Sequence, residues 1–126
     1  MTQALWCVLI AACLPYVGTV LAKAGGHMPA SANRDPRSWL ATLEGWPKRA
    51  HAFQLNSFEA FAPFAVAVLV AQALHAPQGR VDGLALAFIA LRVAYLVCYL
   101  ADRATLRSWL WLGGLACTLA LFLAGV

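Results

Sequence analysis

Four long apolar runs, each at least 19 residues long, occupy most of this 126-residue chain. About 20 residues of α-helix cross a hydrocarbon core of about 30 Å. The pattern therefore predicts an all-α integral membrane protein with one domain, residues 1–126. Its four transmembrane helices are expected at about 4–22, 48–75, 82–102 and 107–125.

The connections between these runs differ in length. Residues 76–82 and 102–107 are short links, and short links make neighbouring helices antiparallel, as in an up-down-up-down bundle. Residues 23–47 form the one long connection, which is rich in Gly and Pro and is expected to be irregular. No Lys or Arg precedes the first run, so we expect it to remain as a helix rather than be cleaved as a signal peptide.

Composition supports the membrane assignment, because 63% of the residues are hydrophobic and only 11% are charged. Soluble domains usually carry about a quarter charged residues. The net charge of +4 is therefore read by its position, and it does not indicate nucleic-acid binding. The first loop, with the adjoining start of the second run, carries Lys23, Arg34, Arg37, Lys48 and Arg49, and the third carries Arg103 and Arg107, whereas the second has only Arg80. This bias predicts cytoplasmic loops one and three, with both termini outside.

Cysteine and histidine show no chemical motif. The four cysteines lie inside apolar runs without a CxxC pair, so they are expected to be buried free thiols. The three histidines flank the runs without ligand spacing, and no metal site is expected. There is no glycine-rich phosphate loop and no Ser-His-Asp pattern.

Two of the runs carry polar residues at helical spacing. On the second run, Arg49, Asn56, Glu59 and Pro63 share one face; on the third, Arg92, Tyr95, Tyr99 and Arg103 do. Ionisable groups inside a membrane are costly, and they normally face a bundle interior, a subunit interface or a wet cavity, with a partner.

The depth of Glu59 in the membrane indicates which residue could be its partner. It lies eleven residues beyond Lys48, and Arg92 lies ten residues before Asp102, so each is roughly 15 Å from the same boundary. We therefore predict that Glu59 and Arg92 form an ion pair or share a polar cluster, within one subunit or across an interface. A structural salt bridge that sets helix register is one interpretation. The longer stripe of amide, phenol and guanidinium groups favours a site for an anionic ligand with an amine.

These residues carry a family resemblance. The sequence resembles the MAPEG family, the membrane-associated proteins in eicosanoid and glutathione metabolism. The motif on helix two is Arg49, then Asn56-Ser57-Phe58-Glu59, then Pro63, and helix three has RVAYLVCY with Arg92, Tyr95 and Tyr99. Arg107-Ser108 follows at about the family position. The four-span layout extends the resemblance over essentially the whole chain.

The resemblance implies a homotrimer that binds glutathione between subunits near the cytoplasmic side. Arg49, Asn56, Glu59, Arg92 and Tyr95 would then bind the peptide. Arg107 or Arg103 would stabilise the thiolate, and Tyr99 would orient the sulfur. A lipophilic electrophile or hydroperoxide would enter from membrane lipid. The resemblance to the bacterial, poorly characterised branch implies a bacterial inner membrane.

One position departs from the family pattern. Members usually carry a second arginine four residues before the asparagine, where this chain has Ala52. Two functions therefore stay open: a glutathione-dependent transferase or peroxidase, and a MAPEG-fold protein that binds a ligand or partner without catalysis. A small channel or transporter is a third interpretation, but the polar stripe is concentrated on one half of the membrane, which argues against a pore.

Overall fold

The computed structural model describes all residues 1–126, and they form an all-helical chain. The elements are α1 (Gln3–Gly25), η1 (Ala30–Arg34), α2 (Pro36–Ala41), α3 (Gly45–Ala73), α4 (Gln78–Leu100) and α5 (Ala104–Phe122). The four long helices are those predicted from the apolar runs, with ends displaced by one to four residues. The first loop is less irregular than expected, because it holds the short helices η1 and α2.

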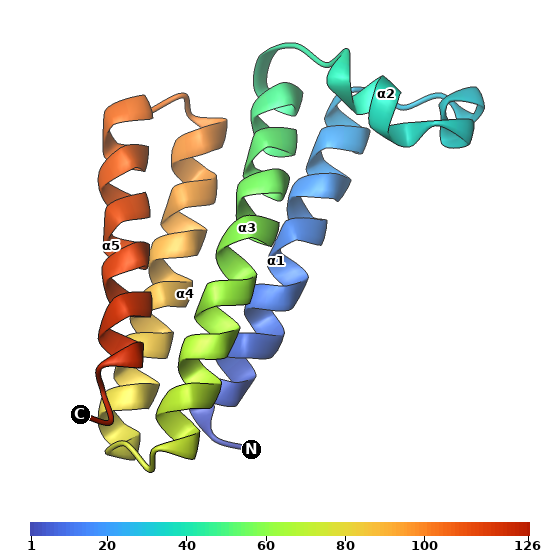
Figure 1. The fold of residues 1–126 in the computed structure, drawn as a ribbon. Helices are drawn as coiled ribbons and strands as arrows, with labels where there is room; N and C mark the ends of the chain where they lie inside the picture. Colours follow the sequence, from blue (N-terminus) through green and yellow to red (C-terminus); the bar gives the residue numbers. More distant parts are fainter.

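The four long helices run up, down, up and down, so both termini lie at one end of the bundle (Figure 1). The opposite end carries the loop from α1 to α3 and the turn from α4 to α5 (Figure 1). We call this second end the basic end, because Lys48, Arg49, Arg103 and Arg107 lie there.

Helices α3 and α4 form the centre of the bundle, with α1 packed mainly on α3 and α5 packed mainly on α4. Phe64 of α3 stacks on Phe88 of α4, with ring centroids 3.9 Å apart. Around this pair the core is built largely of alanine, which lets the helix backbones approach closely. The stacked rings therefore mark the level at which α3 and α4 meet.

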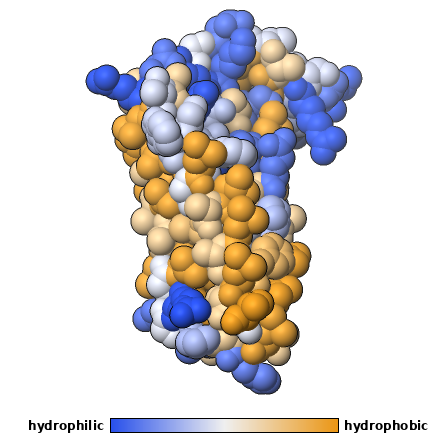
Figure 2. Space-filling view, turned by 60° about the vertical axis from the view of Figure 1, so that its left-hand side comes forward, coloured by the Kyte–Doolittle hydropathy of each residue, from blue (hydrophilic) through white to orange (hydrophobic).

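All four long helices are long and apolar enough to cross a membrane. Large apolar side chains are exposed on each of them, and Figure 2 shows these as a hydrophobic band between two more hydrophilic ends. An aqueous surface of this kind would be costly, whereas lipid solvates it. At 29 residues α3 is about 43 Å long, so its first turns extend beyond the hydrocarbon layer. The chain is an integral membrane protein.

The loop between α1 and α3 is anchored on the basic end by tryptophan. A Cβ atom added to Gly25 would lie 2.2 Å from the Trp46 ring, and one added to Gly26 would lie 2.8 Å from the Trp39 ring. Only glycine leaves space for the two rings against the end of α1. At Gly45, where α3 begins, φ is +64°, a conformation that glycine adopts at little cost. These contacts fix the start of α3, and the candidate site residues Asn56 and Glu59 lie further along the same helix.

Candidate functional site

Arg92 of α4 is the most buried charged residue in the bundle, with 4% of its surface exposed. Its guanidinium donates hydrogen bonds to Asn56 Oδ1 and Ser57 Oγ of α3, both at 2.9 Å. It also lies 4.3 Å from the centroid of the Tyr95 ring, in cation–π geometry. The planar guanidinium can reach two acceptors on successive residues because its donors form a rigid fork.

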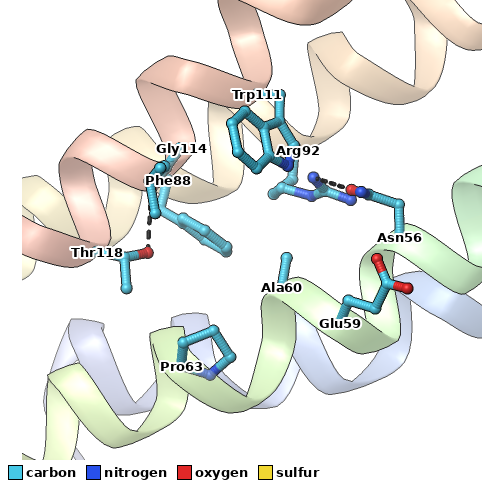
Figure 3. Close-up of a pocket in the computed structure, with 10 residues that line it drawn as sticks. Asn56, Glu59, Ala60, Pro63, Phe88, Arg92, Trp111, Gly114 and Thr118 are labelled. Carbon is cyan, nitrogen blue, oxygen red and sulfur yellow. Dashed lines mark hydrogen bonds between the residues drawn. The ribbon is translucent and has the colours of Figure 1, made fainter.

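Glu59 and Arg92 form no ion pair within the subunit, so the other predicted arrangement, a shared polar cluster, is the one compatible with the structure. The one ion pair in the structure joins Lys48 to Glu44 at 3.7 Å. Glu59 and Arg92 do line the same cavity, so they lie near each other as expected although they form no ion pair (Figure 3).

The register between α3 and α4 explains why Glu59 and Arg92 do not pair within the subunit. Arg49 of α3 contacts the end of α4 at Tyr99, and seven residues further along each helix Asn56 contacts Arg92. Glu59 lies three residues beyond Asn56, so it is about 4.5 Å deeper than the level of Arg92. The depth estimate from the loop boundaries missed this offset because the helices begin and end at residues other than those assumed.

A first cavity of about 170 Å³, which we call the deep cavity, lies between α3 and α5 with α4 as its floor. Asn56, Glu59 and Arg92 line its polar end. Its remaining lining is mainly apolar and comprises Ala60, Pro63, Phe88, Trp111, Gly114, Leu115 and Thr118. Figure 3 shows Arg92 turned toward Asn56, with the Trp111 ring beside it. Thr118 donates to the Gly114 carbonyl, so its hydroxyl is already satisfied.

A second cavity of about 230 Å³, the shallow cavity, lies toward the basic end. It is lined by Asn56, Tyr95, Arg107, Ser108 and Trp111. Asn56 and Trp111 border both cavities, so the two spaces meet at these side chains. We call the two joined cavities the groove. It runs from cationic and phenolic side chains at the basic end to an apolar space within the membrane.

The side chains of Tyr95, Tyr99 and Arg107 contact one another in that order beside the shallow cavity. The two tyrosine rings meet edge to face with centroids 5.1 Å apart. The Arg107 guanidinium lies 4.3 Å from the centroid of Tyr99, across the turn from α4 to α5. This contact fixes where the Arg107 charge lies relative to the cavity.

Three of the predicted site residues line neither cavity, namely Arg49, Tyr99 and Arg103. Arg49 donates from Nε to the Tyr99 carbonyl at 2.9 Å and from Nη2 to the Leu100 carbonyl at 3.2 Å. Arg103 is exposed immediately before α5. Of the two arginines expected to act on a thiol, Arg107 is the one that lines a cavity.

The sequence model of the MAPEG family matches residues 3–126. The chain belongs to the MAPEG family. MAPEG membership identifies it as a membrane protein of the family involved in glutathione and eicosanoid metabolism. No curated protein and no solved structure shows a significant match.

Three residues of the candidate site in this MAPEG chain were not predicted from the sequence. Ser57 is buried and accepts a hydrogen bond from Arg92. A small polar side chain inside a span often lies at a helix contact, so the sequence could have indicated this residue. Trp111 follows Arg107 by four residues and so lies on the same helix face, which could have identified it. Phe88 precedes Arg92 by four residues and forms part of the cavity floor. No polar pattern marks Phe88, because it is one apolar residue among many.

Proposed function

We propose that the groove binds glutathione and that the protein is a membrane-embedded glutathione-dependent transferase or peroxidase acting on a lipophilic electrophile or hydroperoxide. One observation carries the proposal: a cavity with arginine and tyrosine side chains meets an apolar cavity at Asn56 and Trp111. A charged, hydrophilic thiol and a lipophilic partner could therefore occupy adjoining spaces.

The polar residues match the groups of glutathione. One of its two carboxylates suits the guanidinium group of Arg92, because guanidinium pairs well with planar anions. Its ammonium group suits the Glu59 carboxylate, which has no ion-pair partner within the subunit. Asn56 and Tyr95 supply amide and phenol groups for the peptide bonds.

Arg107 is the residue proposed to activate the thiol, with Tyr99 orienting the sulfur. A thiol must become a thiolate to be a good nucleophile, and an adjacent guanidinium favours the anionic form. In conjugation, the thiolate forms a carbon–sulfur bond and the leaving group departs with the bonding electrons. In peroxide reduction, two glutathione molecules supply two electrons and two protons, and the products are the disulfide, an alcohol and water.

The proposed assembly is a homotrimer with the basic end in the cytoplasm. Glu59 is exposed on α3 at membrane depth, where a carboxylate normally faces another subunit or a ligand. The excess of Lys and Arg at the basic end supports the cytoplasmic orientation in a bacterial inner membrane. The lipophilic substrate would reach the deep cavity from the lipid between subunits.

Binding without catalysis is the second candidate, and two observations favour it. Ala52 stands where family members usually have an arginine, and both contacts of Arg49 go to main-chain carbonyls. The chain therefore has fewer free cations for a ligand carboxylate than the resemblance implies.

The two candidates are separated by measuring the ultraviolet absorbance of the glutathione thiolate with the purified protein. We expect a thiolate signal with the wild type, its loss in Arg107→Ala and its retention in Arg103→Ala. Turnover is then followed with a chloronitrobenzene electrophile and an organic hydroperoxide. Binding without turnover of either would support the second candidate, and failure to bind glutathione would exclude the first.

The proposed trimer has its own measurement. Native mass spectrometry of the protein released from detergent should give three copies of the chain. A stable monomer that still binds glutathione would contradict a site completed by a neighbouring subunit.

A further inference from the structure

The residue of interest is Arg49, whose side chain crosses from α3 to the C-terminal end of α4. Its two hydrogen bonds reach the carbonyls of Tyr99 and Leu100, two of the last carbonyls of that helix. The C-terminal end of a helix carries partial negative charge, so a guanidinium is favourable there. Arg49 thus acts as a cap on a helix other than its own.

The end of α4 has an independent reason to need this contact. Asp102 follows the C-cap with φ +57°, and the Arg103 N–H donates to the Cys98 carbonyl at 2.9 Å. This is a Schellman ending formed with aspartate where glycine is usual. The Leu100 carbonyl accepts no main-chain hydrogen bond in this turn, so Arg49 is its donor within the protein.

The contact is linked to the thiol-activating residue through Tyr99. The Tyr99 carbonyl accepts from Arg49, and its ring lies under the Arg107 guanidinium at 4.3 Å. The turn between Tyr99 and Arg107 is only a few residues long, so a displacement of the α4 end would move both.

We infer that Arg49 is a positioning residue that holds the turn between α4 and α5, and thereby Arg107, rather than a residue that touches the ligand. The part that concerns the thiol rests on the proposed function, whereas the part that concerns the turn does not. Loss of Arg49 should therefore change the thiolate absorbance of bound glutathione. It should also increase local opening of the turn between α4 and α5.

Hydrogen exchange tests the turn without any ligand. In Arg49→Gln, we expect the amides of residues 101–107 to exchange roughly tenfold faster, the ratio that corresponds to losing about one charged hydrogen bond. The α3–α4 turn at the opposite end should be unchanged. Lys48→Gln is the matched control, because it removes the same charge from an exposed neighbour whose one ion pair is with Glu44. Unchanged exchange at residues 101–107 in Arg49→Gln would overturn the inference.

Glutathione and its monoethyl ester, in which the glycine carboxylate is blocked, test the link to the thiol. We expect Arg49→Gln to lower the thiolate absorbance while keeping the wild-type ratio of affinities for the two ligands. If Arg49 bound that carboxylate, the ratio would approach one and the thiolate signal of bound glutathione would remain, which would overturn the inference. Arg49→Lys, which can still donate to one carbonyl, should restore part of the thiolate signal.

Failure of the wild type to bind either ligand would count against the proposed function, and the exchange measurement would still decide whether Arg49 holds the turn. If Arg49→Gln does not fold, the same two measurements are made on Arg49→Lys, with smaller expected changes. Wild-type exchange and wild-type thiolate absorbance in folded Arg49→Lys, together with failure of Arg49→Gln to fold, would assign Arg49 a purely structural role and overturn the inference.

Discussion

Arg92 lies opposite Asn56, and its guanidinium donates to the Asn56 amide oxygen at 2.9 Å. The carboxylate of Glu59, one turn further along α3, forms no ion pair with it. A buried cation in a membrane is thus held by neutral acceptors and by the face of Tyr95. The nearby carboxylate of Glu59 is exposed on α3 and lines the same cavity.

Energetic coupling should follow this contact. Asn56→Ala and Arg92→Leu should be non-additive in the free energy of unfolding, with a coupling of about 0.5–3 kcal/mol typical of residues in contact. Glu59→Gln and Arg92→Leu should show a smaller coupling, since no hydrogen bond or ion pair joins them. Denaturant unfolding in mixed micelles measures both cycles, and a larger coupling for the Glu59 cycle would contradict the observed register.

The deep cavity can be filled at Gly114. A Cβ atom added there would lie 3.8 Å from two atoms of the Phe88 ring, so a leucine would extend into the space. We expect Gly114→Leu to weaken use of the lipophilic substrate, seen as a lower kcat/KM, while the thiolate signal of bound glutathione persists. Gly83→Leu is the control, because no atom lies within 4 Å of a Cβ at that glycine. Equal losses in both variants would remove the deep cavity from the proposed mechanism.

Asp82 of α4 caps the start of α1. Its Oδ1 accepts from the Ala4 N–H at 2.8 Å, next to the helix cap formed by Thr2. Asp82→Ala should lower the free energy of unfolding by about 0.5–2 kcal/mol, the usual value for a lost cap acceptor. Asp82→Asn keeps an oxygen acceptor and should lose less. Thermal unfolding of the two variants checks this order, and equal stability of wild type and Asp82→Ala would contradict it.

The short helix α2 should respond to acid through Asp35. The Ser38 hydroxyl and N–H donate to this carboxylate, and they hold the pKa of Asp35 below its ordinary value of 3.8. Because the folded pKa is the lower one, the cap is fully present above pH 3.8 and is lost as the pH falls through the folded pKa. Hydrogen exchange of residues 36–41 should therefore accelerate in that acid range, and Asp35→Asn should remove the acceleration. An unchanged acid response in Asp35→Asn would assign it to another group.

The sequence by itself determined the helices, their antiparallel order and the polar faces that include Asn56, Glu59 and Arg92. These features depend on run length and on a helical period near 3.6 residues, which are local properties of the chain. The motif spacing was also enough to identify the family, because both polar faces are contained in single helices.

Tertiary structure alone decided which members of those faces meet. The stacking of Phe64 on Phe88 and the alanine contacts around it set the level at which α3 passes α4. That level brings Arg92 to Asn56 and Ser57, and brings Arg49 to the carbonyls of Tyr99 and Leu100. A shift of three residues, about 4.5 Å, separates this register from the one estimated by counting from the loops. Helical period leaves such a shift undetermined, and only side-chain packing between the two helices resolves it.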